Sequence, residues 1–167
     1  VDDNIKNLDL FKDFVESWGY ETVTAQQGKD AISLAERYLP DIILLDVMLP
    51  GMSGYEVGKK IREEPEYAEF SETPIIYLTA LNSSSDIVDG FKSGGSDFIS
   101  KPFNKEELLI RISHQLYLVS AKRIITSQTE ELRNTILGRD RLYSVIAHDL
   151  RSPIGSVKMV LNMLTMN

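Results

Sequence analysis

The sequence predicts an α/β fold, in which a doubly wound parallel sheet lies between helices, followed by one long helix. Aliphatic runs of strand length alternate with segments of helical periodicity over residues 1–103, and polar residues end several of these runs. From Lys105 onward the chain contains no Gly or Pro until Gly138. Alternating strands and helices predict a parallel sheet because right-handed crossovers return each strand to the same direction.

The first part of this alternation contains a helix, a strand and a second helix. Apolar residues recur at helical spacing over residues 5–18, and Gly19 is a typical helix stop. Residues 20–25 are rich in β-forming residues, which predicts a strand. Helical spacing returns over residues 28–38 before Pro40 prevents its continuation.

The second part begins with a continuous aliphatic run between Pro40 and Pro50, which ends on Asp46 and predicts a fully buried parallel strand. The elements predicted after it are a helix over residues 55–63, an acidic loop over 64–73, a strand over 74–79, a helix over 83–93 and a short strand over 97–100. The acidic loop is assigned no function.

Asp46 ends the buried aliphatic run, which places it at the carboxyl end of an inner strand. Open α/β sheets bind ligands at this edge. Pro50 and Gly51 follow, so the backbone there can approach a bound ion or phosphate closely. Taken alone, an Asp after a strand more often caps the next turn.

Other polar residues are predicted at the same edge. If the sheet is parallel, Asp2 and Asp3 lie near Asp46, and three adjacent carboxylates repel one another unless a cation joins them. Oxygen ligands suit Mg²⁺, which binds through one or two carboxylates together with phosphate. Thr79 and Lys101 add a hydroxyl and an ammonium group, so the set contains the parts of a phosphoryl-transfer site with Asp46 as nucleophile.

These motifs resemble the receiver domain of response regulators in two-component signalling. The matching residues are the acidic pair Asp2-Asp3, the segment from Asp46 through Pro50 to Gly54, Thr79-Ala80 and Lys101-Pro102. The resemblance covers residues 1–120 and implies a flavodoxin-like sheet with strand order 2-1-3-4-5. One departure is that Val1 alone represents the first, central strand.

The resemblance implies a metal site and a phosphorylation site. Asp46 corresponds to the phosphoacceptor and also contacts the metal. Asp3 and the backbone carbonyl of Met48 correspond to direct Mg²⁺ ligands, and Asp2 would act through a water molecule.

The resemblance also implies the groups that recognise the phosphoryl oxygens. These are the Thr79 hydroxyl, the Ala80 amide and the Lys101 ammonium, with a cis bond between Lys101 and Pro102. Phe98 corresponds to the switch aromatic. Its ring would move inward when phosphorylation draws Thr79 towards the site.

The long helix after residue 120 carries a heptad pattern. One series of positions holds Ile125, Leu132, Arg139 and Ile146, and a second series four residues later holds Thr129, Ile136, Tyr143 and Leu150. The pattern predicts a dimeric coiled coil with polar breaks at Thr129 and Arg139. The alternative is one amphipathic helix that folds back on the first domain.

Near the C-terminus, the segment His148-Asp149-Leu150-Arg151-Ser152-Pro153-Ile154 resembles the H-box of the dimerisation and phosphotransfer domain of histidine kinases. The resemblance implies that His148 is phosphorylated, that Asp149 is its acid/base partner and that Ser152 acts in dephosphorylation. Pro153 predicts a kinked or loosened helix. The resemblance covers residues 139–167 only, so ATP would bind in a catalytic domain outside this chain, and this chain alone is expected not to autophosphorylate.

Charge and composition narrow the function. Residues 1–103 carry a net charge of −10 and residues 104–167 a net charge of +3, which gives the total of −7. An acidic first unit argues against nucleic-acid binding. The chain has no cysteine and no apolar run of transmembrane length, so we expect a cytoplasmic protein with no membrane segment here.

The sequence therefore predicts a receiver domain over residues 1–120, a coiled-coil linker helix over 121–138 and the start of a histidine phosphotransfer helix over 139–167. The predicted function is that of a receiver-first hybrid sensor histidine kinase. Its predicted partners are a second copy bound through the long helix, an upstream phosphodonor kinase or phosphotransfer protein, and a downstream response regulator.

Two other functions are weighed against this one. A receiver-like module could serve as a dimerisation element without phosphorylation. An aspartate-nucleophile hydrolase is disfavoured because such enzymes place an acid two residues after the nucleophile, where this chain has Met48.

Overall fold

The structure is a computed structural model. It describes the backbone of residues 1–80 and 84–165 and the side chains of residues 1–80, 88–146 and 148. The chain divides into two compact units, Val1–Ser120 and Ala121–Asn167. The first contains the sheet and its covering helices, and the second consists, in its described residues, of helix alone.

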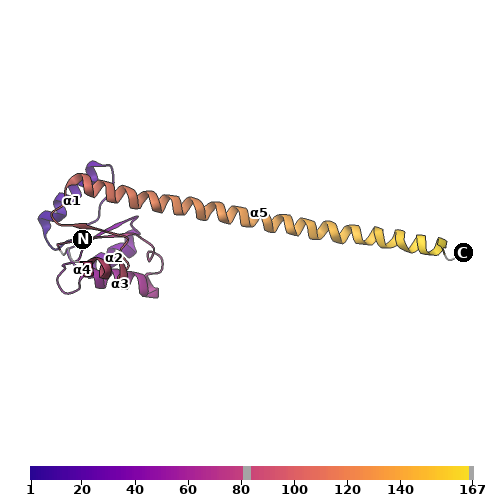
Figure 1. The fold of residues 1–167 in the computed structure, drawn as a ribbon, viewed down its shortest axis with the longest axis horizontal. Helices are drawn as coiled ribbons and strands as arrows, with labels where there is room; N and C mark the ends of the chain where they lie inside the picture. The colour runs from indigo at the N-terminus through magenta and orange to yellow at the C-terminus, as the bar shows by residue number, and fades with distance from the viewer. Residues whose placement is uncertain (81–83, 166–167) are drawn as a thin grey trace. The chain divides into compact units, whose positions relative to one another are not determined.

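The sheet of the first unit has three parallel strands in the order β1 (Ile43–Asp46), β2 (Ile75–Thr79) and β3 (Asp97–Ser100). Figure 1 shows the strands among the helices of this unit. Ile43 lies opposite Ile75, and Thr79 lies opposite Ser100. All five residues of the central strand β2 are buried, as expected for a strand covered on both faces. The parallel register brings the carboxyl ends of all three strands to one edge.

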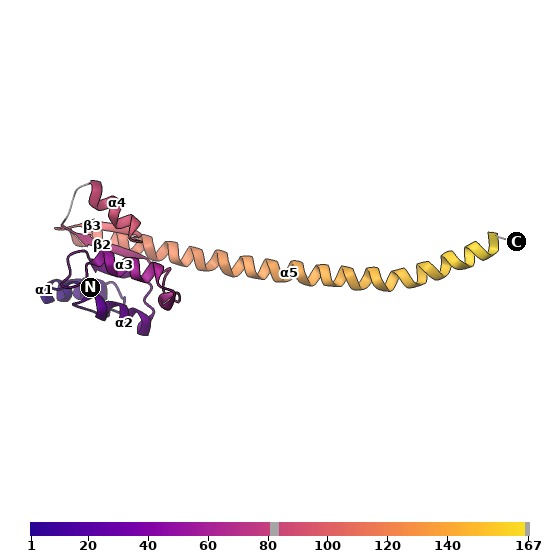
Figure 2. The same ribbon diagram turned by 90° about the horizontal axis from the view of Figure 1, so that it is seen from below.

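Helices cover both faces of the sheet, and the alternation of side chains along each strand divides the core in two. On one face, α2 (Gly28–Tyr38) and α3 (Gly54–Glu63) pack against β1 and β2. On the other face, α1 (Ile5–Ser17) and the start of α5 (Lys105–Thr165) pack against β2 and β3 (Figure 2). The sequence-based prediction of a doubly wound parallel sheet is confirmed.

The short helix α4 (Ser84–Lys92) packs beside β3. Its contact includes Phe91, whose ring meets the Phe98 ring edge-on with centroids 5.6 Å apart. Behind α4, the Tyr77 hydroxyl on β2 accepts a hydrogen bond from the Ser93 hydroxyl at 3.0 Å. The C-terminal end of α4 is thereby tied to the central strand.

Val1 and Asp2 lie between residues 20–25 and β1. The Asp2 amide donates to the Ala25 carbonyl at 3.2 Å, and the Asp46 amide donates to the Val1 carbonyl at 2.9 Å. The strand predicted over residues 20–25 is wrong in this structure, since that segment is extended but is not assigned to a strand. The physical reason is that a strand requires a backbone partner along its length, and Asp2 supplies one hydrogen bond near its end.

The acidic loop after α3 is ordered by an arginine. It contains a short 3₁₀ helix, η1 (Pro65–Tyr67), and a buried phenylalanine, Phe70. The Arg62 guanidinium donates to the backbone carbonyls of Ser71 and Thr73, and its Nε donates to that of Gly94 at 3.0 Å. Arg62 therefore fixes the loop and the turn before β3 together.

The predicted long helix is confirmed, because α5 is continuous for 61 residues. It passes through Gly138 and does not end at Pro153. From Ile124 to Ile146, the described apolar side chains of α5 are exposed in the single chain. No helix among the described residues is both long enough and apolar enough to cross a membrane.

Candidate active site

Three carboxylates meet at the carboxyl edge of the sheet. Asp2, Asp3 and Asp46 each contribute an oxygen, and these oxygens lie within 4.8 Å of one another. The Asp2 and Asp46 residues are 1% and 5% exposed, whereas Asp3 is exposed. Asp46 reaches this position as the last residue of β1, and Asp2 reaches it through the backbone bonds of Val1 and Asp2 beside that strand.

Lys101 joins two of these acids. Its Nζ donates to Asp2 Oδ2 at 2.8 Å and to Asp46 Oδ2 at 2.6 Å. Lys101 follows β3 directly, and its amide donates to the Thr79 carbonyl at 2.7 Å. The predicted cis bond between Lys101 and Pro102 is present. The sheet therefore brings together an ammonium and two buried carboxylates that are 99 and 55 residues away in sequence.

Further donors hold each buried acid. Asp2 Oδ1 accepts hydrogen bonds from the Asn7 side chain at 2.9 Å and from the Asn4 amide at 3.0 Å. Asp46 Oδ1 accepts from the Met48 amide at 3.0 Å. Each acid thus has one oxygen bound to fixed donors and the other bound to Lys101.

The pKa values of the two buried acids shift in opposite directions. Burial raises the pKa of both, since it disfavours the charged form. For Asp2, hydrogen bonds from Lys101, Asn7 and the Asn4 amide outweigh burial, so its pKa lies below the usual value. For Asp46, the bonds from Lys101 and Met48 offset burial only in part, so its pKa lies above the usual value. Asp46 is therefore the more readily protonated acid.

Lys101 remains a cation in this site. Burial lowers the pKa of Lys101, but its hydrogen bonds to Asp2 and Asp46 outweigh burial and raise it. The site therefore contains a fixed positive charge beside the nucleophile candidate Asp46.

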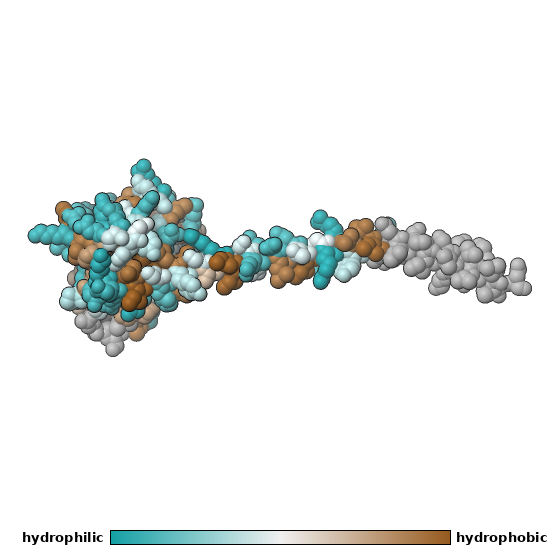
Figure 3. Space-filling view, turned by 90° about the horizontal axis from the view of Figure 1, so that it is seen from above, coloured by the Kyte–Doolittle hydropathy of each residue, from teal (hydrophilic) through white to brown (hydrophobic). Residues whose placement is uncertain are grey.

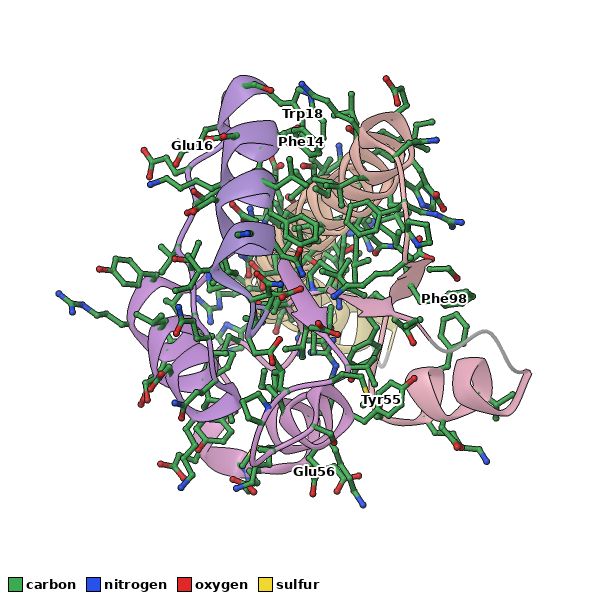
Figure 4. All side chains as sticks on the ribbon, turned by 90° about the vertical axis from the view of Figure 1, so that its left-hand side faces the viewer. Phe14, Glu16, Trp18, Tyr55, Glu56 and Phe98 are labelled. Atoms are coloured by element: carbon green, nitrogen blue, oxygen red, sulfur yellow. The ribbon has the colours of Figure 1, made fainter. Side chains whose placement is uncertain are left out.

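Thr79 and Phe98 lie beside this cluster, on β2 and β3. Thr79 is 4% exposed and is the last residue of β2. Both residues line a small hollow with a cavity volume of about 10 Å³, partly open to solvent, together with Tyr55, Tyr77 and Gly90. Figure 4 shows the Tyr55 and Phe98 side chains extending from α3 and β3 towards α4. The Ala80 residue after Thr79 is exposed.

The donor set fits a hard divalent cation. The three acids supply carboxylate oxygens, which Mg²⁺ prefers, and the exposed Asp3 leaves one side open to the water molecules that Mg²⁺ retains. Two of the acids already bind a cation, Lys101, so the site favours positive charge. The Met48 residue is 64% exposed, and the role of its carbonyl as a metal ligand stays a prediction.

The second predicted phosphorylation site lies on α5 in the second unit. His148 is exposed. The side chains of Asp149 and Ser152 are outside the described residues, so the predicted geometry around His148 stays a prediction.

Two contributors to the first unit were missed from the sequence. Asn7 binds Asp2, and the signal that could have revealed it is its place in the first turn of the helix that follows the acidic pair. Arg62 binds three backbone carbonyls, and no local pattern indicates those partners.

Comparisons with known proteins find relatives of residues 1–113. The family model described as "Response regulator receiver domain" matches residues 1–113 and does not extend over the His148 segment. Response regulator PleD of Caulobacter vibrioides is 40% identical over 112 residues, which cover 67% of this chain and 24% of PleD. The chain therefore matches about a quarter of the length of that relative.

Solved structures give the same result for the fold. Chemotaxis protein CheY4 of Vibrio cholerae is 32% identical, with a TM-score of 0.63 and coverage of 68% of this chain and 92% of that one. The receiver domain of sensor histidine kinase PA1611 of Pseudomonas aeruginosa PAO1 is 31% identical, with a TM-score of 0.63 and coverage of 70% and 93%. In that structure a magnesium ion is coordinated in the active-site cleft. The predicted flavodoxin-like fold is thereby confirmed.

Proposed function

Because the chain belongs to the response regulator receiver domain family, we propose that it accepts a phosphoryl group on Asp46 with Mg²⁺ bound, and that this controls a histidine kinase whose phosphoacceptor is His148. The observation that supports the proposal most strongly is the position of Lys101 Nζ, which lies 2.8 Å from Asp2 Oδ2 and 2.6 Å from Asp46 Oδ2. Lys101 places a positive charge beside a carboxylate nucleophile at the ligand-binding edge of the sheet.

The proposed reaction is a transfer to a carboxylate oxygen. An Asp46 oxygen attacks the phosphorus atom of the donor, a new P–O bond forms, and the donor's leaving group departs with the electron pair of the bond that breaks. Mg²⁺ held by Asp2, Asp3 and Asp46 would supply positive charge that stabilises the phosphoryl oxygens. The Lys101 ammonium moves from the Asp46 carboxylate to a phosphoryl oxygen. Asp46 must be ionised to act, although burial raises its pKa.

The proposed switch uses the hollow beside Thr79. Its hydroxyl and the Ala80 amide would donate to phosphoryl oxygens on Asp46, which draws the end of β2 towards the site. The Phe98 ring, half-buried beside this hollow, would then move into the space that Thr79 leaves. A packing change of this kind has two discrete arrangements and therefore serves as a switch.

The proposed output is a kinase activity of a longer chain. The resemblance of residues 139–167 to a histidine phosphotransfer helix supports it, with His148 as phosphoacceptor and Asp149 as acid/base partner. A receiver domain is part of the sensor histidine kinase PA1611, so the two functions occur in one protein there. The proposed partners are a second copy of the chain, an upstream phosphodonor and a downstream response regulator. ATP would bind in a catalytic domain outside this chain.

The test is phosphodonor labelling of the full chain with radiolabelled acetyl phosphate and Mg²⁺. We expect wild type to be labelled and Asp46→Asn to lose at least about nine-tenths of the label, since it lacks the nucleophile. Asp30→Asn, an exposed acid on α2, is the matched control and should be labelled as wild type. The label should be lost when Mg²⁺ is chelated.

Two results would contradict the proposal. Full labelling of Asp46→Asn would show that another residue is the acceptor. No labelling of wild type, together with an unchanged structure on addition of beryllofluoride and Mg²⁺, would favour the phosphorylation-independent dimerisation module. Labelling of His148→Ala separates the two acceptors, since Asp46 should still be labelled in it.

A further inference from the structure

The second unit exposes an apolar stripe. Ile125, Leu132, Ile136, Tyr143 and Ile146 are between 41% and 64% exposed. Successive members are three, four or seven residues apart, which is the spacing of the a and d positions of a heptad repeat. Figure 3 shows apolar side chains recurring along α5 between hydrophilic ones. The stripe is narrow, as in a coiled-coil seam.

The other described residues of the second unit cannot bury this stripe, since they belong to the same helix. Helices in proteins gain most of their stability by packing an apolar face against another element. A second copy of the chain carries the same stripe with the same period, so the two copies can bury it together. Ile124, Leu137 and Val145 lie off the seam and stay exposed in a two-stranded dimer.

Three residues of the seam are not apolar: Lys122 and Thr129 at a positions near its start, and Arg139 between apolar layers. With Ile125, Leu132 and Ile146 at d positions, Arg139 is also a d residue, in the layer between Ile136 and Tyr143. In a parallel, in-register dimer the two Arg139 side chains lie in the same layer of the seam, and their like charges repel each other. A dimer therefore needs other groups that neutralise them.

The facing helix supplies those groups. In a parallel dimer, each d residue packs into a hole formed by four residues of the facing helix: the a, d and e residues of the same heptad and the a residue of the next one. For Arg139, these four residues of the second copy are Ile136, Arg139, Asp140 and Tyr143. A carboxylate and an aromatic ring are both favourable partners of a guanidinium. Within one chain the same groups are already close, with Arg139 Nη2 3.5 Å from Asp140 Oδ1 and the guanidinium 6.0 Å from the Tyr143 ring.

Other registers lose this match. A shift of one heptad in one direction places Arg139 beside Arg133 of the second copy, which is a like charge. A shift in the opposite direction places it beside Ala147, which offers no side-chain acceptor. The in-register dimer is therefore the one among these that pairs Arg139 with an acid.

We propose that residues 121–146 form a parallel, in-register coiled coil with a second copy of the chain, and that reciprocal Arg139–Asp140 pairs between the copies fix that register. A polar residue at a core position specifies register at a cost in stability. The proposal rests on the homodimer of the proposed function, and it does not depend on phosphorylation of Asp46.

The register is tested by disulfide cross-linking of the full chain, which contains no cysteine of its own. Leu132→Cys at a d position should form a disulfide-linked dimer in most of the protein under mild oxidation. Asn134→Cys, two residues away on the outer face, should form about one-tenth as much. Equal cross-linking of the two variants, or a monomer in sedimentation at the same concentration, would overturn the proposal.

The charge pair is tested by exchange. Arg139→Asp and Asp140→Arg should each weaken dimerisation at least about tenfold, because each places like charges together. The double variant should restore the dissociation constant to within about fivefold of wild type. Arg141→Asp, an outward-facing position, is the matched control and should dimerise as wild type. No recovery in the double variant would overturn the pairing.

Acetyl phosphate labelling of the same variants separates the two proposals. If Asp46 is labelled normally but the double variant does not regain wild-type dimerisation, the register proposal fails and the proposed function stands. If the double variant regains wild-type dimerisation but Asp46 is not labelled, the register proposal stands and the proposed function fails.

Discussion

The two units of the chain hold their charges in different ways. In the first unit, Asp2 and Asp46 are almost completely buried, and Lys101 reaches them from 99 and 55 residues away in sequence. In the second unit, the Arg139–Asp140 pair joins adjacent residues whose side chains are 61% and 60% exposed. The buried charges depend on a formed fold, whereas the exposed pair joins residues that are adjacent in sequence. The difference teaches that the energetic effect of an ion pair depends strongly on how deeply its charges are buried.

The largest effect is expected from removing Lys101. Lys101→Met should lower the rate of Asp46 phosphorylation by about a hundredfold or more, since it removes a cation that stabilises the transferring group. It should also destabilise the fold by about 2 kcal/mol, because it leaves Asp2 and Asp46 buried without their shared cation. Urea unfolding and acetyl phosphate labelling measure the two effects.

Magnesium sharpens this first prediction. If Lys101→Met leaves uncompensated charge, Mg²⁺ should stabilise the variant more than it stabilises wild type. An equal gain in both proteins would show that Lys101 does not neutralise these acids.

A second comparison substitutes a glycine in each unit. Gly58→Ala in the first unit should destabilise the fold by about 2–3 kcal/mol, since the new methyl group overlaps the Tyr77 hydroxyl. Gly138→Ala in the second unit meets no atom within 4 Å and should stabilise the helix by about 0.5–1 kcal/mol. Thermal unfolding followed by circular dichroism measures both.

Removal of the overlapping hydroxyl supplies the control for the first glycine. Gly58→Ala should cost less stability in the Tyr77→Phe background than in wild type, since the hydroxyl oxygen is gone, while the Ser93 carbonyl remains 2.9 Å from the new methyl group. An equal cost of Gly58→Ala in the two backgrounds would mean that the hydroxyl is not the obstacle.

The third prediction concerns pH. Because its pKa is raised in the folded protein, Asp46 takes up a proton at higher pH in the folded than in the unfolded chain. The contribution of Asp46 to the free energy of unfolding therefore decreases as the pH rises through its folded pKa. Mg²⁺ requires the ionised form, so stabilisation by Mg²⁺ should be greatest near neutral pH and should fall as the pH approaches the Asp46 pKa from above. Thermal unfolding with and without Mg²⁺ across this range measures the effect, and Asp46→Asn should flatten it.

The smallest effect is expected at an exposed ion pair of the first unit. Lys59 and Glu63 lie 3.9 Å apart with side chains about two-thirds exposed. Lys59→Met should change stability by less than about 0.5 kcal/mol. A loss comparable to that of Lys101→Met in the same urea assay would break the distinction between buried and exposed pairs.

Local patterns in the sequence predicted the elements that local forces determine. The aliphatic run ending at Asp46 predicted a buried strand, and the long stretch without Gly or Pro predicted a continuous helix. The convergence of Asp2, Asp3 and Asp46 followed from the parallel direction of the strands.

Contacts between distant segments could not be predicted in the same way. That a single Lys101 bonds both acids depends on how β1 and β3 are spaced across β2, and Arg62 finds its three carbonyls only after the loop has folded. The predicted strand over residues 20–25 failed because β-propensity does not supply the neighbouring backbone that a strand needs. A coiled coil likewise requires a second copy, which a single chain does not contain.

In the proposed function, Lys101 affects how tightly Mg²⁺ binds, because its ammonium group already contacts both buried acids. The side chain acts as a resident counter-ion that would offset part of the charge of Asp2 and Asp46 before Mg²⁺ binds and after it leaves. An incoming ion must compete with an ammonium group that is already in place, which weakens its binding and speeds its release. We therefore expect the two buried acids to keep their positions whether or not the ion is bound.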